Sequence, residues 1–352
     1  MSLSSRVIVA GVDLEVRRWP GRGTPILMLH GALSSISTWR DFPARIANTT
    51  QREVIAWSRR GYGSSELLPR PREPEYLQEE AEALPPLLDA LGVDRAHLYG
   101  HSDGASIALI AAALSPARVA SLVLEAPHVL TEERTVDMVA VRKMEYETTD
   151  LREKLSRHHA DVDHVFRRWS DIWLDPRMRY WNIENLLPRI RAPILLIQGL
   201  DDEFATMDQI DRIQAVAPWA QRLELQHCGH GPHREQPQTV LDAVTAFLNQ
   251  LGHVDKPVTG DSPDADQCDS RLLVERGGAA LGRNLLTDEK WTDFAPFLTE
   301  AMSASGLWDV LLQALASTPT GSRERCSPPL NCRFLPDADG FRTSASRATG
   351  VS

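Results

Sequence analysis

Short apolar runs alternate with longer amphipathic segments along most of the chain. Residues 24–31 (TPILMLHG) and 52–58 (REVIAWS) have the length and apolar content of buried strands. Segments with helical spacing follow such runs, and residues 236–251 place their apolar side chains on one helical face. Repeated strand–helix alternation of this kind predicts an α/β fold, with a mostly parallel sheet and helices on both of its faces.

Further segments extend the same pattern. Residues 1–19 predict two short strands around a turn, and residues 73–92 predict an acidic helix that two prolines at 85 and 86 can break. Four more apolar runs predict strands that continue the sheet: residues 96–100 (AHLYG), 119–127 (VASLVLEAP), 191–199 (RAPILLIQG) and 221–230 (QRLELQHCGH).

The alternation stops between residues 128 and 189, where the chain is charged and helical in spacing with no core strand. An insertion between two strands of a parallel sheet lies at one end of the sheet, and ligands bind at the carboxyl ends of such strands. We therefore predict a helical cap over a ligand site, with a peripheral helical hairpin as the alternative. We expect the Trp residues of this segment to pack in its core; the alternative is that Trp169 or Trp173 lines the pocket.

The chain changes character after Leu251. Residues 253–285 are polar and rich in Pro, Gly and Asp, as linkers are. We predict a domain of residues 1–252, this linker, and a tail of residues 286–352 with two short helices followed by a disordered end.

Charge and cysteine usage exclude several classes of function. The net charge of the 352-residue chain is −10, which argues against a nucleic-acid or anionic-membrane surface. No run approaches the roughly 18–20 apolar residues of a membrane span, and the early charges do not fit a signal peptide. The four cysteines form no CxxC pair. We expect a cytoplasmic protein with a small-molecule substrate, without a cofactor or a bound metal; the pattern does not indicate an oligomeric state.

A nucleophile is predicted where an apolar run is interrupted within residues 98–114 (LYGHSDGASIALIAAAL). Residues 100–104 fit Gly-x-Ser-x-Gly between a predicted strand and a predicted helix, the context of a nucleophile elbow. Such a turn lifts the hydroxyl of Ser102 to the end of the sheet, beside the positive end of the next helix. The alternative is a turn that is polar without a catalytic role.

A serine nucleophile needs a base to accept its proton and an acid to orient that base. In chain order the acid follows the serine and the histidine comes last. Strand 191–199 is followed by LDDEF, and the last predicted strand runs into HCGHGPH. Both segments lie at the carboxyl ends of their strands, the same end as Ser102, so we expect their polar side chains to approach the serine.

At these motifs the chain resembles the α/β-hydrolase superfamily over residues 7–251. The motifs are LHGAL, SRRGYGSSE, GHSDGASIAL, IQGLDDEF and CGHGPHREQP, and the Ser-Asp-Gly elbow is most similar to the biphenyl hydrolase-like (valacyclovir hydrolase-like) esterases. The resemblance implies Ser102 as nucleophile, Asp202 as acid and His230 as base. It also implies an oxyanion hole formed by the backbone N–H groups of Ala32 and Asp103, which sets no requirement on their side chains.

Within this resemblance, Asp202 is selected over Asp201 and His230 over its neighbours His227 and His233. Glu125 remains an alternative acid, because some members of the superfamily take the acid from the earlier strand. The chain departs from the common pattern in two places: Ala105 replaces a second glycine, and Ser58 replaces an aspartate. Both departures concern packing near the site and leave the three catalytic positions intact.

Other residues have metal-ligand or nucleophile chemistry. The segment His158–His164 (HHADVDH) contains metal-ligand residue types, although a solvated helix of the cap explains it better. We expect Cys228, beside the predicted base, to be a buried structural thiol. The tail resembles two separated pieces of the N-terminal region of IS5-type insertion-element transposases, without the catalytic carboxylates of that family.

Together these features predict a serine hydrolase that cleaves a carboxylic ester of a small molecule through an acyl-enzyme. Two alternatives use the same residues: hydrolysis of a carbon–carbon bond in a ring-cleavage product, and cofactor-free perhydrolysis. An alternative from another class is a ligand receptor that keeps the fold without useful turnover. A fold alone does not name a substrate.

Overall fold

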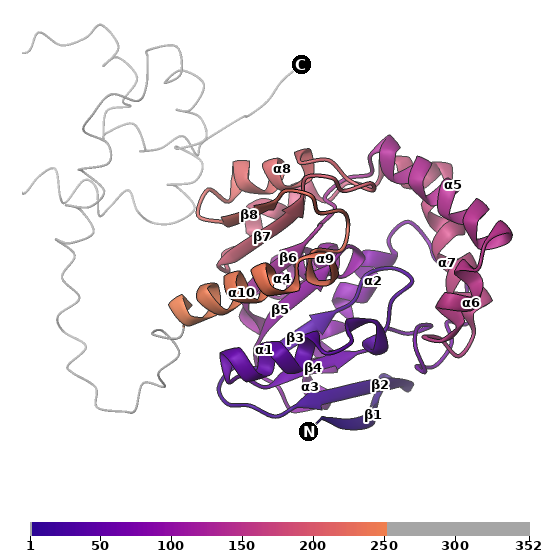
Figure 1. The fold of residues 1–352 in the computed structure, drawn as a ribbon. Helices are drawn as coiled ribbons and strands as arrows, with labels where there is room; N and C mark the ends of the chain where they lie inside the picture. Colours follow the sequence, from indigo (N-terminus) through magenta and orange to yellow (C-terminus); the bar gives the residue numbers. More distant parts are fainter. Residues whose placement is uncertain (1, 252–352) are drawn as a thin grey trace, which may run out of the picture. The chain divides into compact units, whose positions relative to one another are not determined.

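The computed structural model describes residues 2–251, in which eight strands form one sheet in the order β1-β2-β4-β3-β5-β6-β7-β8 (Figure 1). Strand β2 pairs antiparallel with both β1 and β4, and every other neighbouring pair is parallel. The strands are β1 (Leu3–Val9), β2 (Val12–Trp19), β3 (Ile26–Leu29), β4 (Val54–Trp57), β5 (Ala96–His101), β6 (Val119–Glu125), β7 (Ile194–Gly199) and β8 (Gln221–Leu225).

Helices cover both faces of this sheet, which confirms the predicted fold class. Along β3, Ile26 and Met28 point into the hydrophobic cluster under α1 (Phe42–Thr50) and α10 (Pro237–Leu251). The intervening Leu27 points into the larger cluster on the other face, since successive side chains of a strand alternate. Several helices supply side chains to that larger cluster, among them α2 (Tyr76–Glu82), α3 (Leu84–Leu91), α4 (Asp103–Leu114) and α8 (Asp208–Val216).

The acidic segment forms two helices, α2 and α3, that meet at Ala83. The pair Pro85 and Pro86 lies in the first turn of α3. The missing N–H of proline leaves no hydrogen bond unmade there, because the first turn of a helix has no intrahelical acceptors for it. The prolines therefore start the second helix, and the break falls just before them.

Between β6 and β7 the chain forms an insertion of helices (Figure 1). It contains α5 (Glu133–Thr148), α6 (Leu151–Ser156), α7 (Val162–Trp173) and the 3₁₀ turns η3 (Pro176–Tyr180) and η4 (Glu184–Arg189). Tyr146 of α5 stacks on Phe166 of α7 with ring centroids 3.7 Å apart, which joins the two helices.

The predicted linker, the predicted tail and the transposase-like pieces all lie outside the described residues. Among the helices within residues 2–251, none is both long enough and apolar enough to cross a membrane.

Candidate active site

Ser102 lies at a sharp turn between β5 and α4. Its backbone has φ 54° and ψ −122°, an uncommon conformation for a residue other than glycine. The turn requires Gly100 and Gly104, because a Cβ on Gly100 would lie 2.4 Å from the carbonyl oxygen of Gly104, and one on Gly104 would lie 2.1 Å from that of Leu29. The N–H of Ser102 donates to the carbonyl oxygen of Glu125 on β6, which fixes the turn at the end of the sheet.

The structure brings Ser102, His230 and Asp202 into one chain of hydrogen bonds. Nε2 of His230 lies 2.9 Å from Oγ of Ser102. Nδ1 of the same ring lies 2.9 and 3.0 Å from the two carboxylate oxygens of Asp202. Because a carboxylate can only accept, Nδ1 carries the proton and Nε2 is left free to accept the proton of the serine hydroxyl.

Asp202 is buried and well supplied with donors. Its carboxylate accepts the N–H groups of Phe204 and Ala205 and the side-chain amide of Gln198. Burial would raise the pKa of this carboxyl, but the His230 ring and the N–H donors lower it by more, so the pKa of Asp202 lies below its usual value. Asp202 is therefore ionised at neutral pH. Its neighbour Asp201 differs in burial, because the side chain of Asp201 is exposed.

The loop that carries His230 is held on three sides. Nε2–H of His101 donates to the carbonyl oxygen of His230 at 2.7 Å. Glu203 accepts the backbone N–H of His230, and Glu235 accepts those of Gly229 and Gly231. These bonds hold the backbone on both sides of the His230 ring.

Ala32 and Asp103 line the same cavity as Ser102. Asp103 is the first residue of α4, whose N–H has no intrahelical acceptor. Within residues 2–251 neither N–H donates a hydrogen bond to another group. Both N–H groups are thus available to an oxygen atom bound beside Ser102.

The loop before Ala32 is fixed by His30. Nε2 of His30 accepts the N–H of Arg59, so Nδ1 carries the proton and donates to the carbonyl oxygen of Gly31 at 2.7 Å. Burial and the charge of Arg59 lower the pKa of His30 well below its usual value, which keeps the ring neutral.

The carboxylate of Asp103 is buried in an ion-pair network. It accepts the hydroxyl of Tyr76 at 2.9 Å and lies 3.5 Å from the buried guanidinium of Arg59. Tyr76 in turn accepts Nε1–H of Trp173 on α7 at 2.9 Å. A hydrogen-bonded path therefore joins the inserted helices to the first turn of α4.

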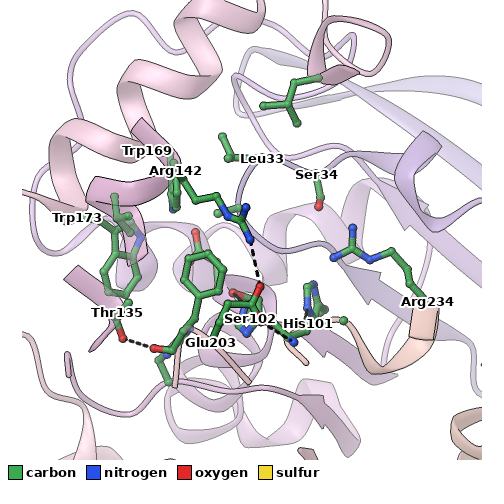
Figure 2. Close-up of a pocket in the computed structure, with 18 of the residues that line it drawn as sticks. Leu33, Ser34, His101, Ser102, Thr135, Arg142, Trp169, Trp173, Glu203 and Arg234 are labelled. Carbon is green, nitrogen blue, oxygen red and sulfur yellow. Dashed lines mark hydrogen bonds and ion pairs between the residues drawn. The ribbon is translucent and has the colours of Figure 1, made fainter. Parts of the chain in front are cut away.

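Ser102 opens into a cavity of about 260 Å³ between the sheet and the inserted helices (Figure 2). Trp169 and Trp173 are buried in the hydrophobic core and also line this cavity. The expectation that they pack in the core and the alternative that they line the pocket are therefore both correct in part. The apolar part of the lining consists of Ala32, Leu33, Val139, Leu151, Leu155, Trp169, Trp173 and Phe204.

Sequence reasoning missed His128, which lines the cavity next to His230. Its ring lies between those of Trp173 and His230, with centroids 5.6 and 5.9 Å away. Burial and the His230 ring lower the pKa of His128 to about 4, and its Nδ1 has no hydrogen-bond partner among the described residues. Its position just after β6, at the carboxyl ends of the strands, is the sequence signal that could have identified it.

Glu125, the alternative acid, binds other groups. Its carboxylate lies 2.6 Å from Nδ1 of His233 and accepts the hydroxyl of Tyr99, also at 2.6 Å. Asp202, and not Glu125, is therefore the carboxylate in contact with the His230 ring.

The remaining candidates also have structural surroundings. His158 bonds to Ser37, and His159 accepts the N–H of Gly63 and donates to Leu33. The described residues contain no group of three His, Cys, Asp or Glu side chains arranged to hold a metal. Cys228 is buried, and burial together with nearby carboxylates raises the pKa of its thiol to about 12.

The two departures from the family pattern lie in packed surroundings. Ala105 is fully buried. The hydroxyl of Ser58 donates to the carboxylate of Glu15 at 2.8 Å and accepts the N–H of Ile36. Glu15 on β2 thus places a carboxylate beside Ser58.

Comparison with known proteins identifies the family. Residues 26–243 match the model of the alpha/beta hydrolase family. The chain belongs to this family. Its named relatives and structural neighbours are hydrolases, in accord with an enzyme of this fold.

Two curated relatives indicate the range of chemistry in this part of the family. The chain is 28% identical over 208 residues to human serine hydrolase BPHL, across 56% of this chain and 70% of that protein. It is 27% identical over 251 residues to a 2-hydroxy-6-oxononadienedioate/2-hydroxy-6-oxononatrienedioate hydrolase of Pseudomonas putida, across 63% of this chain and 87% of that enzyme.

Solved structures share the fold. The crystal structure of E-2-(acetamidomethylene)succinate hydrolase matches 71% of this chain and all of its own chain, with a TM-score of 0.58 and 20% identity. Proline iminopeptidase of Mycobacterium smegmatis matches 72% of this chain and all of its own, with a TM-score of 0.59 and 19% identity.

Proposed function

We propose that this protein is a serine hydrolase that cleaves carboxylic esters of small molecules through an acyl-enzyme. The observation that carries the proposal is the hydrogen-bonded chain from Asp202 through His230 to Ser102, which ends in a cavity. In this proposal Ser102 is the nucleophile, His230 the general base and Asp202 the group that orients the base.

The proposed reaction has two halves. His230 accepts the proton of Ser102 as Oγ attacks the ester carbonyl, and the N–H groups of Ala32 and Asp103 donate to the developing oxyanion. His230 then gives the proton to the departing alkoxide, which leaves an acyl group on Ser102. Water, activated by the same ring, attacks the acyl carbon and releases the acid.

We also propose that helices α5–α7 act as the cap of this site. Thr135, Val139 and Trp169 from these helices line the cavity that holds Ser102. Since most of these side chains are apolar, they would bind an apolar part of the substrate and exclude water from the acyl-enzyme.

Burst kinetics with a 4-nitrophenyl ester test this proposal. An initial release of one 4-nitrophenolate per protein molecule, followed by slower turnover, is expected for an acyl-enzyme. Ser102→Ala is expected to abolish the burst and to lower turnover by at least about 10³-fold. Turnover that survives in Ser102→Ala would overturn the proposal. A burst without turnover would favour the alternative of a ligand receptor that keeps the fold without useful turnover.

A second candidate is hydrolysis of a carbon–carbon bond. It is favoured by the Pseudomonas putida relative, whose name describes a dienedioate hydrolase. Water would be added across the bond between a carbonyl carbon and its neighbour, giving a carboxylic acid and an enol. Comparison of kcat/KM for a simple aryl ester and for a vinylogous diketone separates the candidates: the ester proposal predicts the higher value for the ester.

A further inference from the structure

A second recess adjoins the cavity that holds Ser102. Its volume is about 380 Å³, and it shares the side chains of Leu33, Ser34, Leu155 and Arg234 with that cavity. A recess of this size can hold a small charged substituent of a substrate whose reacting carbonyl lies beside Ser102.

Cations dominate this recess. Arg40 follows the 3₁₀ turn η1 (Ile36–Trp39), Lys154 lies on α6, Arg157 follows α6, and Arg234 lies on α9 (Pro232–Glu235). The described residues that line the recess include no Asp or Glu. We call this group of four residues, drawn from three separate segments, the basic recess.

Two of the four cations have no acidic partner. No carboxylate of the described residues lies within ion-pair distance of Arg40 or Arg234. Figure 2 shows Arg234 extending from its helix toward the cavity that holds Ser102. Arg40 keeps its long charged side chain at a backbone φ of 55°, a conformation that costs energy for any residue except glycine.

The other two cations form exposed pairs within one helix turn. Lys154 lies 2.8 Å from Asp150, and Arg157 lies 3.0 Å from Glu153. Exposed pairs of this kind contribute little free energy. Neither acid lines the recess, so both cations can turn their charge toward a ligand.

The nearest acids of the cavity are already engaged. Glu203 pairs with Arg142 and accepts the N–H of His230. Glu235 accepts two backbone N–H groups of the His230 loop. Neither of these two carboxylates forms an ion pair with Arg40, Lys154, Arg157 or Arg234.

The pKa of His158 is affected by the same positive charges. Its ring borders the recess, and burial together with the charges of Arg40 and Arg157 lowers its pKa. Cations from two separate segments thus act on one point inside the recess.

From this arrangement we infer that the basic recess binds an anionic group of the substrate, so that the preferred esters carry a carboxylate or a phosphate at a distance from the scissile bond. Guanidinium groups bind both anions through paired N–H donors, which makes arginine well suited to either. The inference rests on the proposed ester hydrolysis and adds the substrate class to it.

Matched ester pairs test the inference. The first pair is mono-4-nitrophenyl adipate and 4-nitrophenyl hexanoate, which place an anionic or a neutral end on the acyl part. The second pair is 4-carboxyphenyl butanoate and 4-carbamoylphenyl butanoate, which do the same on the alcohol part. In at least one pair, kcat/KM is expected to be about tenfold higher for the anionic ester than for the neutral one. This anionic-to-neutral ratio is expected to fall as the salt concentration is raised from about 50 to about 500 mM, because salt screens the attraction between the anion and the cations.

Variants then assign the preference to the recess. Arg40→Gln and Arg234→Gln are each expected to lower the anionic-to-neutral ratio by at least about threefold, and together by about tenfold. The matched control is Arg22→Gln, an exposed arginine before β3 at the opposite end of the strands, which should leave the ratio unchanged. A ratio near one in both ester pairs, or a ratio that the recess variants do not alter, would overturn the inference.

A binding measurement separates this inference from the proposed reaction. Ser102→Ala is titrated calorimetrically with adipate and with inorganic phosphate, and the titrations are repeated with Arg40→Gln and Arg234→Gln added. Saturable binding that the two substitutions remove supports the recess even if no ester is hydrolysed, and the better ligand identifies the anion. If esters are hydrolysed but neither anion binds, the proposed function stands and the recess assignment fails.

Discussion

Nδ1 of His233 lies 2.6 Å from the carboxylate of Glu125 in a pair that is buried on both sides. Glu125 also accepts the hydroxyl of Tyr99, while its backbone oxygen accepts the N–H of Ser102. Glu125 therefore holds the turn at Ser102 through its backbone oxygen, and Asp202 is the carboxylate that bonds to His230.

Three amide substitutions test which carboxylate acts as the acid. Asp202→Asn can keep a hydrogen bond to His230 but favours the wrong tautomer, a change known to cost about 10⁴ in turnover in a well-studied triad. We expect it to lower kcat by about 10³–10⁴ with 4-nitrophenyl esters. Glu125→Gln is expected to lose less than about tenfold, and Asp201→Asn, an exposed control, should match the wild type.

The contrary result is specific. If Glu125→Gln were the crippled variant and Asp202→Asn retained most of its turnover, the acid would belong to β6, and Asp202 would be a structural carboxylate of the loop after β7.

The buried charge of Asp103 is expected to stabilise the fold. Asp103→Asn can still accept the hydroxyl of Tyr76 but leaves the buried guanidinium of Arg59 with one acidic neighbour fewer. Removing one partner of a buried ion pair costs several kcal/mol, so urea unfolding should show a loss of at least about 2 kcal/mol.

The matched control is Asp89→Asn, which removes an exposed pair with Arg118 and should cost less than about 1 kcal/mol. Equal losses in the two variants would show that the Asp103–Arg59 contact contributes no more than a surface pair.

His128 is expected to make the protein sensitive to acid. Its pKa is about 4 in the folded state because it is buried, against about 6.5 in the unfolded chain. As the pH falls from 6.5 to 4, the unfolded chain takes up a proton that the folded state does not, so stability is lost over this range. For this one group the loss amounts to about 3 kcal/mol.

Unfolding free energies measured at pH 7 and pH 4 check this expectation. His128→Gln should lose less stability than the wild type on acidification, whereas His227→Gln, an exposed control, should follow the wild type. Parallel curves for wild type and His128→Gln would contradict a neutral, buried His128.

The parts of the molecule that follow local rules could be predicted from the sequence. The strand–helix alternation gave the sheet and its two helical layers, because side-chain periodicity reports which face is buried. Ser102 could be named from five residues, since the Gly100 and Gly104 positions tolerate no Cβ. The names Asp202 and His230 depended on chain order and family resemblance, and the structure supplies the contacts between them.

Features built from distant segments could not be predicted in this way. His128 faces Trp173 and His230 across three separate elements, so its position just after β6 indicates the end of the sheet on which it lies but not these contacts. The basic recess joins Arg40, Lys154 and Arg234, which are far apart in the chain. In the sequence each of them is an ordinary charged residue on a solvated segment.

The central claim is that Ser102 is an activated nucleophile, and covalent labelling tests it most directly. A fluorophosphonate probe should modify the wild-type protein at one site, and mass spectrometry of its peptides should place the adduct on Ser102. The Ser102→Ala variant should remain unlabelled while keeping the melting temperature of the wild type. If Ser102→Ala were labelled to the same extent as the wild type, the result would contradict the assignment of the nucleophile and, with it, the proposed mechanism.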